Sequence, residues 1–294
     1  MKRIALASCA AWPNLSEDDR LLIPALQQFN VEAVPAIWDG SVDWTQFDLV
    51  IVRSCWDYHL RPGKFLGWIT KLEKAGVLVQ NLPHLIRWNA DKRYLRQLRE
   101  SGASIPHSVW IEDREEVTVH HIMQEQDWSS AVVKPTVSAS AHNLRRVGKD
   151  DPAVSLKGPA LVQQFIPEIV SSGEWSLVFL GGEFSHAVIK RPGPEDFRVQ
   201  SQFGGKSTLA NPRAEIVEEA RKVVASLPGE PLYARIDGVD CAGQFVLMEV
   251  ELIEPELFLG MGNASDRFAE KIAGVLDGHE PSSKPSRSHL ASAK

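Results

Sequence analysis

The first 80 residues alternate short apolar runs with amphipathic segments, and this alternation most narrows the folds open to the chain. The apolar runs IALAS, EAVPAIW, DLVIVRS and VLVQ predict strands. Amphipathic helices are expected from Glu17 to Phe29 and before Gly76. Strands that alternate with helices form a parallel sheet with helices on both faces. We therefore predict an N-terminal α/β domain over residues 1–88.

The rest of the chain is richer in hairpins, which predicts an α+β arrangement. Gly181-Gly182 joins the runs EWSLVFL and EFSHAVIKR, and two glycines allow the positive φ of a two-residue hairpin turn. A second hairpin is expected between LYARIDGVD and QFVLMEVEL. Helices are predicted in four places: ADKRYLRQLRES with Asn89 as its N-cap and Gly102 after its end, His120 to Gln126, Pro212 to Ser226, and Asp266 to Leu276.

These elements predict a second domain over residues 89–277, with lobes of about 89–165 and 166–277. The tail 278–294 lacks hydrophobic periodicity, so we expect it to be disordered.

Composition narrows the class of function. Lys and Arg number 32 and Asp and Glu number 38, a net charge of −6, so the chain lacks the basic face that nucleic-acid binding requires. No apolar run reaches the roughly 18 residues that span a bilayer. Cys9, Cys55 and Cys241 are odd in number and far apart, which excludes a disulfide framework and a CxxC site. We expect a cytoplasmic protein with a small-molecule partner, bound to neither nucleic acid nor membrane.

Three acids on the second predicted hairpin are the strongest chemical signal. Glu249 and Glu251 share a face of their strand because side chains alternate. A three-residue loop at 241–243 would pair residue 237 with 247 and place Asp237 diagonally beside Glu249. Buried carboxylates need a cation, and all-oxygen ligands suit Mg²⁺. The alternative is an edge hairpin whose acids face water or pair with Arg235.

Scattered cations and small-residue loops accompany these acids. Lys134 ends the run AVVKP, Lys190 ends a hairpin strand, and Arg198 follows in EDFRVQ. The loops TVSASAHN and QFGGKST could present backbone N–H groups to phosphate oxygens. QFGGKST lacks the first glycine of a P-loop, LGMGNAS lacks the last glycine of the dinucleotide fingerprint, and GxSxG and HExxH motifs are absent.

The segment RSCWDYHLRPG, residues 53–63, follows a predicted parallel strand and is rich in polar and aromatic groups. Ligands of such sheets lie beyond the carboxyl ends of the strands. We predict that Arg53 binds a substrate carboxylate and Asp57 an amino group. The alternative is a surface turn that packs locally.

In this order, the motifs resemble the ATP-grasp ligase superfamily, glutathione-synthetase-like, over roughly residues 89–277, and the preceding α/β unit is similar to its N-terminal domain. The resemblance implies that NADKRYLRQL and VVKP supply the ATP-binding Lys92 and Lys134, and that LVQQFI is the hinge strand with Gln164 and Phe165. RIDG followed by MEVE resembles its magnesium set, here Asp237, Glu249 and Glu251. In AVIKRPGPEDFRVQSQFGG, we expect Arg198 and Lys190 to be catalytic.

Two departures narrow the resemblance. Glu251 stands where most members have Asn, and the small-residue loop lacks glycine. With RSCWDYH and ELIEPELFL, the chain looks most like the subgroup that contains the D-cycloserine-forming ligase. This implies an ATP- and Mg²⁺-dependent carboxylate–amine ligase that acts through an acyl phosphate on a small amino-acid-like substrate, with ring closure as one form of the reaction. The alternative is an ATP-binding regulatory protein that keeps the fold without ligase activity.

Overall fold

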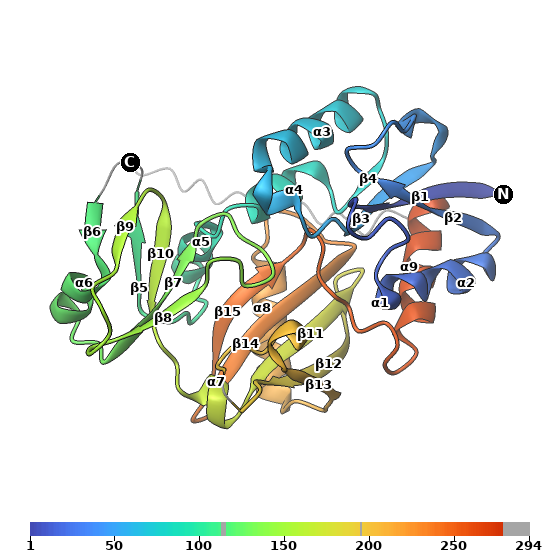
Figure 1. Cartoon of the computed structure of the whole chain (residues 1–294). Helices are drawn as coiled ribbons and strands as arrows, with labels where there is room; N and C mark the ends of the chain where they lie inside the picture. Colours follow the sequence, from blue (N-terminus) through green and yellow to red (C-terminus); the bar gives the residue numbers. More distant parts are fainter. Residues whose placement is uncertain (113–115, 195, 279–294) are drawn as a thin grey trace, which may run out of the picture.

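The structure, a computed structural model, describes residues 1–112, 116–194 and 196–278. Over these residues the strands form two four-stranded sheets, one five-stranded sheet and one strand pair (Figure 1). Apart from Gly278, the predicted tail 278–294 lies outside the described residues. None of the helices within the described ranges is long and apolar enough to cross a membrane.

The N-terminal sheet has the order β2-β1-β3-β4, and all of its strands are parallel. This confirms the α/β prediction. The predicted helix from Glu17 to Phe29 is two short helices that divide at Leu21, with the Ser16 hydroxyl as the N-cap of the first. The elements of this part are β1 (Lys2–Ser8), α1 (Glu17–Arg20), α2 (Leu22–Gln27), β2 (Val31–Ile37), the 3₁₀ turn η1 (Trp44–Gln46), β3 (Leu49–Ser54), η2 (Tyr58–Leu60), α3 (Pro62–Lys74), β4 (Val79–Gln80) and α4 (Pro83–Asn89).

The second sheet along the chain has the order β5-β10-β7-β8 and is antiparallel. It is called the central sheet because its residues lie in the middle of the sequence. It stands apart from the other sheets at the left of Figure 1, beside the small β6–β9 pair. The three short strands β6, β8 and β9 were not predicted, because three or four residues give too little alternation to detect. The elements are α5 (Tyr94–Glu100), β5 (Ser108–Ile111), β6 (Glu116–Thr118), α6 (Val119–Glu125), β7 (Ser130–Pro135), β8 (Arg145–Gly148), β9 (Ser155–Lys157) and β10 (Ala160–Gln164).

The five-stranded sheet has the order β13-β12-β11-β14-β15 and is antiparallel. Gly181 and Gly182 form the predicted turn between β11 and β12, with φ of 57° and 74°. The α+β prediction for this half of the chain is confirmed. The elements are α7 (Glu168–Ser171), β11 (Glu174–Leu180), β12 (Glu183–Arg191), η3 (Ser201–Phe203), β13 (Lys206–Leu209), α8 (Ala214–Ala225), β14 (Tyr233–Cys241), β15 (Gln244–Glu251) and α9 (Ala264–Leu276).

Asn89 is not the N-cap that the sequence predicts. It is the last residue of α4, and its side-chain amide donates to the carbonyl of Val250 and accepts from the N–H of Leu252, both at 2.8 Å. Its polar group therefore satisfies the backbone at the end of β15 instead of a helix start. Helix α5 begins only at Tyr94, and Lys92 lies in the turn between the two helices.

The N-terminal sheet and the five-stranded sheet share one hydrophobic core. Ile4 and Leu6 of β1 pack in the same cluster as Val178 of β11 and Phe268 of α9. The side chain of Asn81 adds polar contacts across this junction, to the backbone of residues 232, 233 and 252. The central sheet has a second core, which includes Ile111, Ile122, Val133, Val147 and Val162, while Leu161 of β10 packs in the cluster of the five-stranded sheet. The division at residue 88 and the two lobes of the second domain stay predictions.

Candidate active site

The hairpin β14–β15 places the three predicted acids on one face. Ala242 and Gly243, with φ of 50° and 96°, form a two-residue turn that pairs Cys241 with Gln244, so the predicted three-residue loop is wrong. A bulge at Met248 then shifts the register, and Asp237 lies directly opposite Glu249 instead of diagonally. Gly238 is required here, because a Cβ would lie 2.2 Å from the ring of Phe245.

Basic side chains hold all three acids. Asp237 accepts from Arg235 at 2.9 Å, from Lys190 at 3.1 Å and from the hydroxyl of Ser176 at 2.6 Å. Glu249 pairs with Lys92 at 2.6 Å, and Glu251 pairs with Arg235. Across the described ranges, no three His, Cys, Asp or Glu side chains converge as a metal-binding group. The alternative prediction, pairing with Arg235, thus describes Asp237 and Glu251 in this structure.

The cluster nevertheless contains more acids than bases. Its acids are Glu174, Asp237, Glu249, Glu251 and Glu254, and its bases are Lys92, Lys134, Lys190 and Arg235.

The pKa values of Glu249 and Glu251 shift in opposite directions. Burial raises the pKa of Glu251 to about 7, with Asp237 and Glu249 adding to the rise. Burial would also raise the pKa of Glu249, but Lys92 and Lys134 outweigh it and lower that pKa. A hard divalent cation beside these carboxylates would favour their charged forms, and oxygen donors of this kind fit Mg²⁺.

Most of the predicted site residues line one pocket between the central and five-stranded sheets. Its wall includes Lys134, Gln164, Phe165 and Arg198 together with Asp237, Glu249 and Glu251. Lys92 and Lys190 join this group through their ion pairs with Glu249 and Asp237. The structure therefore brings together nine of the eleven predicted site residues.

Lys134 is the most electrostatically distinct cation in the pocket. It is 6% exposed, and burial lowers its pKa to about 8, although Glu249 raises it in part. No ion pair with another described residue fixes its ammonium. A buried lysine without a fixed partner is well suited to meet an anion such as phosphate.

One wall of the pocket is apolar and aromatic. The guanidinium carbon of Arg146 lies 3.9 Å from the ring centre of Phe165, and Phe197 meets the same ring edge-on at 5.9 Å. The backbone N–H of Phe165 donates to the carbonyl of Ser130. Flat, apolar surfaces of this kind suit a planar base.

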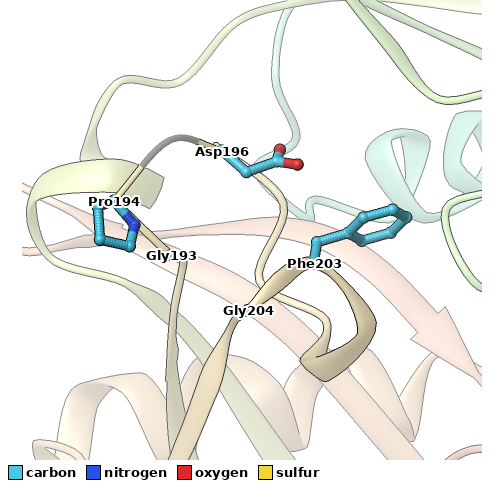
Figure 2. A pocket seen from close by; sticks show the side chains of 5 residues that line it. All are labelled: Gly193, Pro194, Asp196, Phe203 and Gly204. Atoms are coloured by element: carbon cyan, nitrogen blue, oxygen red, sulfur yellow. The ribbon is translucent and has the colours of Figure 1, made fainter.

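Arg198 is held by its own loop. Its guanidinium pairs with Asp196 at 2.6 Å and lies 3.5 Å over the ring of Phe203. Figure 2 shows Asp196 and Phe203 beside a hollow that Gly193, Pro194 and Gly204 also line. Arg198 reaches the pocket wall but is not free to meet a phosphate until this pairing opens.

Arg53 and Asp57 lie away from this pocket, and both are engaged. Arg53 is 0% exposed and donates to the carboxylate of Asp19 at 2.8 Å and to the carbonyl of Pro255 at 2.6 Å. It is part of strand β3 and not of the loop after it, which argues against its predicted bidentate contact with a substrate. Asp57 accepts one hydrogen bond on each oxygen, from Trp38 and from Arg61, and its predicted contact with an amino group stays a prediction.

Sequence reasoning missed Glu174, Ser176 and Glu254 as members of the site. Glu174 lies opposite Lys190 across the β11–β12 hairpin and pairs with it at 2.5 Å. Counting back from the Gly181-Gly182 turn would pair Glu174 with Ile189, but a bulge near Val178 moves it to Lys190. The hairpin pattern therefore predicts a partner for Glu174 that is one residue away from the observed one, Lys190.

Comparison with known proteins supports the resemblance drawn from the motifs. Residues 4–81 match the family described as the N-terminal domain of D-cycloserine synthetase DcsG. The chain is 27% identical to the cycloserine biosynthesis protein DcsG of Streptomyces lavendulae over 93% of this chain and 98% of that protein. A crystal structure of D-cycloserine synthetase DcsG superposes with a TM-score of 0.80 at 24% identity, over 93% of this chain and 99% of that one.

A RimK-domain ATP-grasp protein from Sphaerobacter thermophilus superposes with a TM-score of 0.66 at 17% identity, over 92% of this chain and all of that one. The fold is therefore that of ATP-grasp proteins, as the motifs predicted. The homologues of the chain are ligases that form carbon–nitrogen bonds, among them glutathione synthetases.

Proposed function

We propose that this chain is an ATP- and Mg²⁺-dependent carboxylate–amine ligase that acts through an acyl phosphate on a small amino-acid-like substrate. One observation carries the proposal: the acids of β14–β15 share a pocket with the buried Lys134 and the aromatic wall at Phe165. Homology to DcsG favours ring closure of a single substrate, as in D-cycloserine formation. The cysteines are free thiols, which fits action in the reducing cytoplasm.

Different residues of the pocket would bind the adenine, the phosphates and Mg²⁺. The wall at Gln164 and Phe165 would take the adenine, and Lys134 would meet the phosphates. Asp237, Glu249 and Glu251 would hold Mg²⁺, which neutralises phosphate charge when bound. The cations Arg198, Lys190 and Arg235 border the same place, where negative charge spreads as the phosphoryl group moves.

The reaction needs no nucleophilic side chain. A substrate carboxylate oxygen attacks the γ-phosphorus, and the bond to the β,γ-bridging oxygen breaks to release ADP. The amine then attacks the acyl carbon, and inorganic phosphate leaves with the pair of electrons of the acyl C–O bond. The protein positions the reactants and stabilises charge, which is the work its cations and acids can do.

The ion pairs of all three acids must change before Mg²⁺ and ATP can bind in this way. Lys92 must release Glu249, Arg235 must release Glu251, and Asp237 must turn an oxygen away from Arg235 or Lys190. Glu249 and Glu251 line the pocket and are partly exposed, with side chains 31% and 26% accessible, so each can reorient without unfolding the hairpin. The freed cations would then face the phosphates.

An ADP-release screen over amino acids, small peptides and O-ureido-D-serine tests the proposal. ADP should form only with Mg²⁺ and a carboxylate substrate, and hydroxylamine should trap the acyl phosphate as a hydroxamate. Release of AMP and pyrophosphate would contradict the acyl-phosphate route. ATP binding without turnover across the screen would instead favour the regulatory alternative.

ATP binding should weaken as the pH rises above about 8. Phosphates favour the charged form of Lys134, so the complex keeps a proton that the free protein, with a Lys134 pKa of about 8, has lost at higher pH. Each further pH unit should then weaken binding up to about tenfold, until the pKa of the complex is reached. Titration calorimetry between pH 7 and 9.5 measures the slope.

A matched pair of variants assigns this slope. Lys134→Met should bind ATP weakly with no such slope, whereas Lys149→Met, at an exposed position after β8, should behave as the parent protein does. A slope that persists in Lys134→Met would remove Lys134 from the phosphate site.

A further inference from the structure

Gln200 lines the same pocket as the acids, and its side-chain oxygen has no hydrogen-bond partner. This oxygen, Oε1, is buried, and no donor among the described residues reaches it. A buried amide oxygen without a donor is costly, so such groups are rare in folded proteins. None of the roles assigned above uses Gln200. Its oxygen is therefore available for a hydrogen bond from a ligand.

The backbone at Gln200 is held in place by its own loop. Its carbonyl accepts from the backbone N–H groups of Phe203 and Gly205, at 3.0 and 3.2 Å. The preceding residue, Val199, is 2% exposed and shares a hydrophobic cluster with Ile169. Gly205 allows the loop to close, because a Cβ there would lie 2.0 Å from the carbonyl oxygen of Val199. The side chain of Gln200 therefore lines the pocket from a fixed backbone position.

The segment from Phe197 to Gln202 extends from the aromatic wall to the loop TVSASAHN. Phe197 lines the pocket and meets Phe165 edge-on at 5.9 Å. At the other end of the segment, the side-chain amide of Gln202 donates to the carbonyl of Ser140 at 3.1 Å. Gln200 is only two residues from Gln202, so we place it toward the loop TVSASAHN and away from the base.

The loop TVSASAHN in turn contacts the acid cluster. The carbonyl of Ser138 accepts from the ammonium of Lys92 at 2.8 Å, and the same ammonium pairs with Glu249 at 2.6 Å. The loop that Gln202 contacts is therefore bound to one of the acids proposed to hold Mg²⁺. This places Gln200 at the end of the pocket where the phosphates would react.

The reactants offer few hydrogen-bond donors at that end. The phosphates of ATP, the substrate carboxylate and the acyl phosphate formed from it carry acceptor oxygens. The attacking amine is neutral when it reacts, and it carries both N–H donors and one lone pair. An acceptor that binds one N–H would direct the lone pair toward the acyl carbon.

We propose that the side-chain oxygen of Gln200 accepts a hydrogen bond from the attacking amine and so orients it toward the acyl phosphate. The inference rests on the proposed ligase function and concerns its second step, the attack of the amine. An amide oxygen accepts a hydrogen bond but does not take the proton. Gln200 therefore binds and orients the amine and leaves phosphoryl transfer unchanged.

The test measures how the acyl phosphate divides between two nucleophiles. The probe is the substrate that releases ADP fastest in the screen above, at the hydroxylamine concentration where the parent protein forms equal amounts of ligated product and hydroxamate. Gln200→Leu removes the acceptor and should shift this ratio about tenfold toward hydroxamate. Its single-turnover ADP formation should stay within about threefold of the parent rate, since phosphoryl transfer precedes the attack.

Two further variants separate orientation of the amine from damage to the loop. Gln200→Glu keeps an acceptor and has no N–H donor, so its ratio of product to hydroxamate should lie within about threefold of the parent ratio. Gln202→Leu is the matched control, because it removes a glutamine amide from the same loop, where it bonds Ser140. Its ratio should stay within about twofold of the parent ratio.

The outcomes separate the inference from the proposed function. No ADP or hydroxamate from the parent protein with any substrate would defeat the ligase function, and the inference with it. An active parent protein whose ratio is unchanged in Gln200→Leu would overturn the inference alone. An equal shift in Gln202→Leu would also overturn it, because an opened loop would then admit hydroxylamine. A tenfold shift in Gln200→Glu would contradict the role of Oε1 as an acceptor.

Discussion

Glu249→Gln should reduce ADP formation by about a thousandfold at saturating substrate, since it removes a charged oxygen ligand from the place where phosphoryl charge develops. Hydroxamate formation should fall by the same factor, because both depend on the same transfer. Raising the Mg²⁺ concentration should restore only part of the rate. Steady-state ADP release with a Mg²⁺ titration measures all three effects.

A matched variant on the same hairpin controls for damage to the strands. Asp240→Asn removes a carboxylate from the far end of β14, where it pairs with Arg213 at 2.9 Å, and it should leave turnover within about twofold. Normal turnover by Glu249→Gln would withdraw Glu249 from the magnesium set. A drop in ADP release that Asp240→Asn shares would indicate damage to the hairpin.

Arg53→Met should destabilise the protein by about 3–5 kcal/mol, because it leaves Asp19 as an uncompensated buried charge. Both side chains are almost inaccessible, at 0% and 3%, and their ion pair is 2.8 Å long. Urea unfolding of the parent and variant proteins measures the loss. The double variant Asp19→Asn with Arg53→Met should be more stable than Arg53→Met alone, since it removes both charges.

The same experiment decides between two roles for Arg53. If Arg53→Met unfolds at the parent urea midpoint and only the KM of the carboxylate substrate rises, the substrate contact predicted from the sequence is right. Loss of stability that Asp19→Asn relieves shows a structural ion pair instead.

The fold could be predicted from the sequence because each indicator of it is a short run of neighbouring residues. Alternating apolar runs fixed the parallel sheet, and Gly181-Gly182 marked a turn whose φ values only glycine adopts easily. Register was harder to predict. A bulge at Met248 depends on how Gly238 packs under Phe245, a contact between strands that no single run of residues encodes.

The sequence predicted which residues belong to the candidate site, but it did not predict which acid pairs with which base. Asp237, Glu249 and Lys134 stood out because charged groups interrupted apolar strands. The sequence suggested that Arg53 lies in a loop, but β3 continues through it and buries its side chain against Asp19. How deeply each of these two side chains is buried cannot be read from the sequence. Glu254 lies within the motif ELIEPELFL, but that motif pointed to a subgroup of ligases and not to a role for this side chain.

The carbonyls of residues 254–256 accept hydrogen bonds from Trp56, Arg53 and Arg235. Together with the shared core and the side chain of Asn81, these bonds join the N-terminal sheet to the five-stranded sheet. The central sheet has a core of its own, but Leu161 of β10 packs in the cluster that contains Leu177 and Leu247 of the five-stranded sheet. The proposed nucleotide pocket is lined by residues of both of these sheets, so a substitution that changes the packing at Leu161 would change the shape of the pocket as well.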